Sequence, residues 1–215
     1  MQLTDSMNNI LIAISILSAF AVIIVGIKNF SKLNYPLRVI LYLSIFAFLN
    51  DLASLILAKN GVSNLLLINI YELILGYSIL SFYFFAEKNF FRHLKLLRIV
   101  FVAIYLVVWV TSDSGFQSFN GLGMSIEAII LIAISLLFFF QVYRKEETPF
   151  LESSGIFLVA IGVLFYFSGA LFSFLLSADI LSQSPEKFYH SWILHNISNT
   201  VKNIFFTIAL FKSSR

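Results

Sequence analysis

Seven long apolar runs are the feature that most constrains the fold of this 215-residue chain. They cover about residues 9–28, 36–58, 65–86, 96–112, 122–143, 151–178 and 191–211. Each run is close to the roughly 20 residues that an α-helix needs to cross the hydrocarbon core of a bilayer. None shows the alternation of polar and apolar residues that is typical of a transmembrane β-strand. The sequence therefore predicts an all-α, polytopic membrane protein with seven transmembrane helices in a single domain.

The composition agrees with a membrane protein and argues against a soluble one. Hydrophobic residues make up 60% of the chain, charged residues only 12%, and the mean hydropathy is +0.93. Soluble domains carry about 25% charged residues. The absence of cysteine excludes disulfides and thiolate metal sites. The net charge of +3 comes from basic residues in loops, so we expect the lipid bilayer as partner and no nucleic acid.

The distribution of Lys and Arg predicts the orientation in the membrane. Only Lys59 and Lys187 fall in the loops of one side, and Lys202 falls inside the last run. The other side collects Lys28, Lys32, Arg38, Lys88, Arg92, Lys95, Arg98, Arg144, Lys145, Lys212 and Arg215. Because basic loops stay in the cytoplasm, the N-terminus is expected outside and the C-terminus in the cytoplasm of a bacterial inner membrane. No Lys or Arg precedes Lys28, so the first run is interpreted as a retained helix and not as a signal peptide.

A short sequence similarity between two parts of the chain suggests an internal repeat. The segment Ile10-Leu-Ile-Ala-Ile-Ser15 recurs at residues 130–135, and Pro36 and Pro149 stand at comparable places before the second and sixth runs. Helical transporters are often built from such repeats. We therefore consider two parallel three-helix repeats, residues 1–90 and 122–215, joined by a linker helix at 96–112. Chance similarity between apolar segments is the alternative.

Polar side chains interrupt several runs and, counted from the loops, all lie in the predicted outer half. A charged residue at the centre of a membrane costs roughly 2.5–3.5 kcal/mol, so it usually faces the interior of the bundle. The pattern predicts a polar cavity that is open to the outer side and lined by the second, third, fifth and seventh helices. The candidate ligand-binding residues are Asp51, Asn69, Tyr71, Glu72, Glu127, His195, Asn199 and Lys202.

A structural role is the alternative for the same residues. Asp51 or Glu72 would then bond to Lys202, and the asparagines would join neighbouring helices. We favour ligand contact for these three charged residues and helix–helix contact for the asparagines. Glu127 stays open between the two, because the dipole near a helix N-terminus favours a carboxylate there.

The charges of this cluster limit the ligand. Two or three carboxylates face one lysine, which leaves a negative charge that the membrane interior disfavours. Either an acid is protonated, His195 is protonated, or a cation binds. The cluster therefore predicts proton coupling or a cationic ligand.

The seven helices, the lysine in the last one and the carboxylate in the third resemble microbial rhodopsins. By this resemblance Lys202 would carry retinal as a Schiff base, with Glu72 or Asp51 as its counter-ion. The chain departs from that family at Ser198, where an acid is usual. It also lacks the family's sixth-helix Trp and Tyr-Pro pair, and offers Phe165 and Phe172 instead.

The segment Tyr189-His190-Ser-Trp-Ile-Leu-His195 resembles the last helix of the seven-helix hydrolases that include alkaline ceramidases. Those enzymes hold zinc with three histidines. Here His93 falls in a loop on the predicted cytoplasmic side, and His190 and His195 are five residues apart. A catalytic or metal site is therefore not assigned, and an enzyme is not favoured.

Two further resemblances concern most of the chain. The segments Tyr35-Pro-Leu-Arg38 and Asn69-Ile-Tyr71-Glu72 are similar to those of small uncharacterised seven-helix inner-membrane proteins of the Bacteroidetes type. The length and topology also resemble small seven-helix solute carriers, although Pro36 and Pro149 lie at helix starts and not in mid-helix.

The resulting hypothesis is a membrane protein that binds a small solute, lipophile or ion in the outer cavity. A proton- or cation-coupled transporter is favoured, because no loop is long enough to form an output domain. The alternative is a seven-helix sensor or receptor that signals through a separate membrane or cytoplasmic protein.

Overall fold

The computed structural model describes residues 2–111, 118–145, 154–183 and 193–212. All regular structure in these ranges is helical: seven α-helices and one short 3-10 helix, η1 (Phe30–Lys32). The α-helices are α1 (Gln2–Lys28), α2 (Tyr35–Lys59), α3 (Leu65–Ala86), α4 (Leu94–Val110), α5 (Gly121–Lys145), α6 (Gly155–Gln183) and α8 (Ile193–Lys212). They coincide with the seven apolar runs, which confirms the all-α prediction.

The helix ends follow from local sequence. The Asn34 side chain caps α2 by accepting a hydrogen bond of 3.2 Å from the Leu37 amide, and Pro36 occupies the first turn. Asn120 caps α5 in the same way, accepting from the Gly123 amide at 3.1 Å. After α2 the chain turns at Gly61, whose φ of +69° suits a residue without a Cβ.

Within the described ranges, five helices are long and apolar enough to cross a membrane. They are Ile10–Lys28, Tyr35–Lys59, Leu65–Ala86, Gly121–Arg144 and Gly155–Leu175. By length and composition this is a helical membrane protein. Two helices fall short for different reasons: α4 has only 17 residues, and α8 carries His195, Asn196, Asn199, Lys202 and Asn203 on its buried face.

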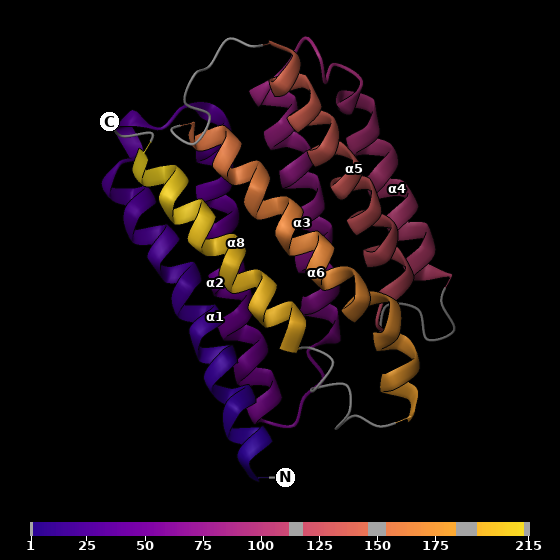
Figure 1. The fold of residues 1–215 in the computed structure, drawn as a ribbon. Helices are drawn as coiled ribbons and strands as arrows, with labels where there is room; N and C mark the ends of the chain where they lie inside the picture. The colour runs from indigo at the N-terminus through magenta and orange to yellow at the C-terminus, as the bar shows by residue number, and fades with distance from the viewer. Residues whose placement is uncertain (1, 112–117, 146–153, 184–192, 213–215) are drawn as a thin grey trace.

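Successive helices run in opposite directions, so α1 begins at one end of the bundle and α8 ends at the other (Figure 1). The last helix lies between α1 and α6, and α3 packs against α2, α4 and α5. Glycines bring α6 and α8 close together. A Cβ at Gly162 would lie 3.2 Å from the Lys202 carbonyl oxygen, and a Cβ at Gly169 would collide with Ser198. Small residues allow this kind of close approach between membrane helices.

The helix pairs form two comparable sets. In one, α2 packs against α1 and α3; in the other, α6 packs against α5 and α8. The sets join where α1 meets α8 and α5 meets α3, while α4 is added beside α3 and α5. Two parallel repeats with a linker helix would produce such a pattern. The repeat itself stays a prediction.

Candidate functional site

A cavity of about 190 Å³ lies between α1, α2, α3 and α8. It is in the half of the bundle where α1 begins, α2 ends and α8 begins. Its walls are Ile12, Ser15, Ile16, Asn50, Asp51, Ser54, Leu55, Ala58, Asn64, Ile68, Tyr71, Glu72, His195, Asn196 and Asn199. The clustering of polar residues in one half of the bundle therefore agrees with the sequence-based expectation.

The cavity extends from the interior of the bundle to its surface. Glu72, at the inner end, is fully buried, whereas Ala58 is exposed and Asn64 is half-exposed at the turn between α2 and α3. A single water needs only about 10–15 Å³ of such volume. The cavity is therefore large enough for several waters or a small solute that enters from this end.

Glu72 provides an unsatisfied acceptor at the inner end of the cavity. Its Oε1 accepts a hydrogen bond of 2.9 Å from the Tyr166 hydroxyl. Its Oε2 is buried and accepts no hydrogen bond within the described part of the chain. Asp51 adds a second carboxylate from α2. Since a buried acceptor without a partner costs about 1–3 kcal/mol, this end of the cavity favours a donor or a cation.

Lys202 lies behind the cavity wall and not in it. Its Nζ donates to the Tyr71 hydroxyl at 3.2 Å and lies 4.2 Å from the centre of the Tyr166 ring. Phe206 is also within 6.0 Å. Such cation–π contacts contribute about 2 kcal/mol where the cation is desolvated. The expectation that Lys202 is the innermost lining residue is therefore corrected: Lys202 is not among the lining residues, and its Nζ contacts Tyr71 and Tyr166 instead.

Asparagines of α8 join this helix to α1. The Asn199 side chain donates to the Ser15 hydroxyl at 2.8 Å, and Asn203 donates to Ser18 at 2.9 Å. The Asn199 Oδ1 is buried and accepts no hydrogen bond among the described residues. Asn199 thus connects two helices through its nitrogen and lines the cavity as well.

His195 and Asn196 complete the α8 wall. The His195 ring lies 5.5 Å from Tyr166 and 5.9 Å from Phe174, between centroids. In the described part of the structure, Asn196 Nδ2 and Ser54 Oγ are buried without a hydrogen-bond partner. Several donors and acceptors around the cavity are therefore available to a solute or to water.

Asn69 does not line the cavity. Its Nδ2 donates to the Ser118 carbonyl at 2.7 Å, its Oδ1 accepts from the Asn120 amide at 3.1 Å, and its own carbonyl accepts from the Tyr105 hydroxyl at 3.0 Å. These bonds attach α3 to α4 and to the start of α5. The expected ligand role of Asn69 is replaced by a structural one.

Glu127 and α5 do not line the cavity either. The Glu127 side chain is fully buried against Gly76 of α3 and near Phe101 of α4. The helix that lines the cavity in place of the expected α5 is α1. It does so because α8 packs between α1 and α6, whereas α5 packs against α3, α4 and α6. A sequence signal for α1 existed in Ser15 and Ser18, two hydroxyls on adjacent turns of an otherwise apolar helix.

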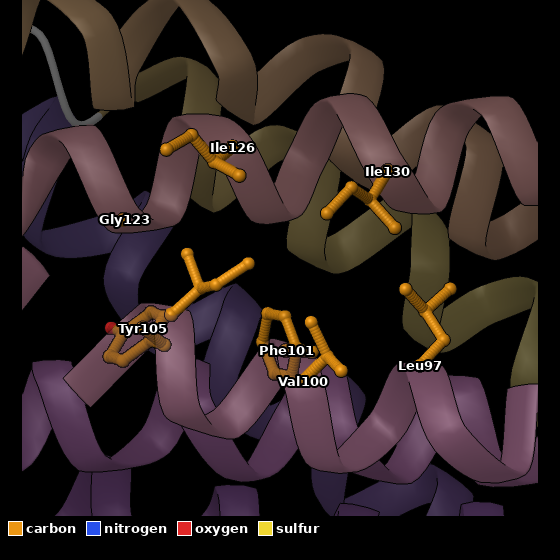
Figure 2. A pocket seen from close by; sticks show the side chains of 8 residues that line it. Leu97, Val100, Phe101, Tyr105, Gly123, Ile126 and Ile130 are labelled. Atoms are coloured by element: carbon orange, nitrogen blue, oxygen red, sulfur yellow. The ribbon is translucent and has the colours of Figure 1, made fainter. Parts of the chain in front are cut away.

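A second, much smaller space of about 20 Å³ lies between α4 and α5. Figure 2 shows its apolar side chains, including Phe101 and Ile130, pointing into the gap between the two helices. This space holds about one water, and its lining offers that water almost no polar partner. The contact between α4 and α5 at Phe101, a residue that also lies near Glu127, is therefore apolar.

The cofactors that the resemblances imply do not fit. Lys202 Nζ contacts Tyr71, Tyr166 and Phe206, and Lys202 is not among the residues that line the cavity, so the lysine is not presented to a retinal in that space. For zinc, the described residues contain no group of three His, Cys, Asp or Glu that could bind a metal ion. His93 is exposed before α4, and His190 lies outside the described residues.

No protein-family model, curated protein or solved structure matches this chain. The fold and the cavity alone define its class: a helical membrane protein with a cavity that can hold several waters or a small solute and that is lined by two carboxylates. The resemblances to rhodopsins, solute carriers and Bacteroidetes-type membrane proteins stay predictions.

Proposed function

We propose that this chain crosses a bacterial inner membrane seven times and binds a small organic cation in the cavity between α1, α2, α3 and α8. The observation that carries the proposal is the Glu72 carboxylate, which belongs to the cavity lining and whose buried Oε2 accepts no hydrogen bond within the described residues. A positively charged group supplies that donor and offsets the excess of acid.

The walls favour a solute that is small and partly apolar. Ile12, Ile16, Leu55 and Ile68 supply apolar surface, while amides and hydroxyls are arranged around them. Pockets of this mixed kind orient a ligand through a few polar groups and bury the remainder. An amine with a short alkyl chain matches both features.

Transport is the activity that this site supports best. The cavity opens at the end where α1 begins, which the distribution of basic residues places outside the cell. α4 and α8 are the remaining two membrane crossings in this arrangement. The carboxylates release a bound proton or inorganic cation when the cationic solute binds, so uptake of the solute is coupled to an ion gradient.

Binding is tested with purified protein in detergent, using methylammonium and methylguanidinium, two small cations with N–H donors, as probes and acetate as the anionic comparison. We expect the two cations, and not acetate, to raise the melting temperature, because ligand binding to the folded state stabilises it. Glu72→Gln and Asp51→Asn should remove the effect. Tyr83→Phe is the control, since the Tyr83 hydroxyl bonds to Ser135 away from the cavity. An equal response in all variants would contradict the proposal.

Transport is tested in proteoliposomes with radiolabelled methylguanidinium, a permanent cation that does not cross the bilayer as a neutral base, and an imposed pH gradient. We expect uptake that follows the gradient and is lost in Glu72→Gln. Binding without uptake, together with capture of a membrane or cytoplasmic partner protein, would instead support a receptor.

A further inference from the structure

Glu127 is a fully buried carboxylate of α5 with no charged partner of opposite sign among the groups that act on it. Its side chain is 0% exposed, and its nearest hydrogen-bond donor is the Gly76 backbone, at a geometry outside the ordinary range. One oxygen lies against α3 at Gly76, where a Cβ would collide with it. The missing side chain of Gly76 therefore creates the space that the carboxylate occupies.

The surroundings of Glu127 offer it no positive charge. The charged group that acts on it most strongly is Glu72, another acid. The hydroxyls of Tyr71, Tyr105 and Tyr166 are the other titratable groups in electrostatic range from α3, α4 and α6. An ionised carboxylate in such a place costs several kcal/mol, whereas a neutral carboxylic acid does not carry this penalty.

Glu127 is connected to the cavity through α3. Glu72 and Gly76 are four residues apart, so they lie on the same stripe of the helix, one turn from each other. Glu72 lines the cavity, and Glu127 rests on the next turn. Towards the C-terminal end of α3, the next polar contact is the 2.7 Å hydrogen bond between the Tyr83 and Ser135 hydroxyls. The side chains between it and Glu127 are apolar and buried: Ile79, Leu80 and Leu131. Glu72 is therefore the acid on the adjoining turn of α3 and the charged group that acts most strongly on Glu127.

We propose that Glu127 is a second, dry binding site of the bundle, that its ligand is a proton, and that it exchanges this proton with the cavity through Glu72. In the transfer, the O–H bond of the Glu72 carboxylic acid breaks and an O–H bond forms on Glu127. The negative charge moves in the opposite direction, so the pair keeps a constant total charge. The proposal does not depend on solute binding.

Infrared spectroscopy of the purified protein in lipid tests the site directly. A protonated carboxylic acid in an apolar environment gives a carbonyl stretching band that is separate from the amide bands. At neutral pH we expect one such band to disappear in Glu127→Gln and to shift in Glu127→Asp, which keeps the acid. The Asp variant also serves if the Gln variant folds poorly. The same band in wild type and both variants would overturn the proposal.

Hydrogen–deuterium exchange tests the route. After transfer to heavy water, the Glu127 band shifts at the rate at which its proton is replaced. We expect this rate to fall several-fold in Glu72→Gln and to stay unchanged in Asp51→Asn, which removes the cavity carboxylate on α2. Equal rates in wild type and Glu72→Gln would overturn the role of Glu72. Loss of cation binding with normal exchange would reject the proposed solute site and leave this proposal intact.

Discussion

Glu72 and Glu127 are both fully buried carboxylates beside α3, yet their environments differ in almost every other respect. Glu72 borders a cavity of about 190 Å³, accepts a hydrogen bond from Tyr166 and has Lys202 as the nearest cation that acts on it. Glu127 lies against the backbone of Gly76, its nearest hydrogen-bond donor, and the charged group that acts on it most strongly is another acid. Burial alone therefore does not define a functional acid. The donors and the water that reach it distinguish the two.

Replacing each acid by methionine, which has a similar volume, is the most direct test of the difference between Glu72 and Glu127. Glu72→Met removes the acceptor of Tyr166 and leaves Lys202 without its nearest opposite charge. We expect a loss of about 3 kcal/mol in the free energy of unfolding. Glu127→Met removes a buried acid that has no positive charge acting on it, so we expect stability that is unchanged or higher.

Reversible denaturation in mixed micelles, followed by circular dichroism, measures both variants. Similar losses for the two substitutions would show that Glu127 has a stabilising partner, and the contrast between the acids would fail. Ser78→Ala on α3 is the control for the procedure, because this half-buried residue has no contact with either carboxylate among the interactions of the described structure.

A smaller effect is expected from Gly76→Ala. The added Cβ would overlap the Glu127 carboxylate and lie 2.6 Å from the Phe101 ring. Overpacking of this kind typically costs about 1–3 kcal/mol. We expect a lower melting temperature, and a partial recovery in Gly76→Ala combined with Glu127→Ala, because the shortened side chain leaves room for the Cβ. Additive effects of the two changes would contradict the contact.

Tyr166→Phe should have a still smaller effect. It removes the hydroxyl that donates to Glu72 Oε1 at 2.9 Å but keeps the ring over Lys202. A hydrogen bond to a charged group contributes about 1.5–3 kcal/mol, and water from the cavity can replace part of it. We expect a loss of about 1 kcal/mol in denaturation experiments. Tyr83→Phe is the matched control on the dry side, where its partner Ser135 keeps a bond to the Leu131 carbonyl.

The smallest effect concerns the bond between α1 and α8. Ser15→Ala, Asn199→Ala and the double variant form a thermodynamic cycle around the 2.8 Å contact. Side-chain hydrogen bonds between membrane helices contribute about 0.6 kcal/mol on average. We expect a coupling free energy of this size. A coupling of zero would mean that each side chain bonds equally well to water in the cavity.

The number and type of helices could be predicted from the sequence because apolar runs of about 20 residues leave few alternatives. Asp51, Tyr71, Glu72, His195 and Asn199 were expected in a cavity and line one, because buried polar residues in membrane helices face the interior. This rule predicts that a polar residue lies inside the bundle, but it does not predict which cavity or contact the residue joins. It places a residue inside the bundle without stating which helices are neighbours.

That missing information explains the corrections. Glu127 and Asn69 are interior residues, but they face α3 and the start of α5 and not the cavity. The Lys202 side chain bends towards two tyrosines, a contact that depends on the packing of α6 against α8. Tyr166 was not singled out, although it is a tyrosine in a helix otherwise rich in phenylalanine. Helix pairing brings these residues together from distant parts of the sequence.

The polar face of α8 has a consequence for how the protein is made. This helix is synthesised after α1 to α6, and its own hydropathy is too low for it to qualify as a membrane segment. Its amides and its lysine find their partners in Ser15, Ser18 and Tyr71, which belong to α1 and α3. If α8 is the seventh crossing, as proposed above, its insertion into the bilayer is a cooperative step that requires the earlier helices to be assembled first. A chain that stops before α8 would leave the hydroxyls of Ser15, Ser18 and Tyr71 without these bonds.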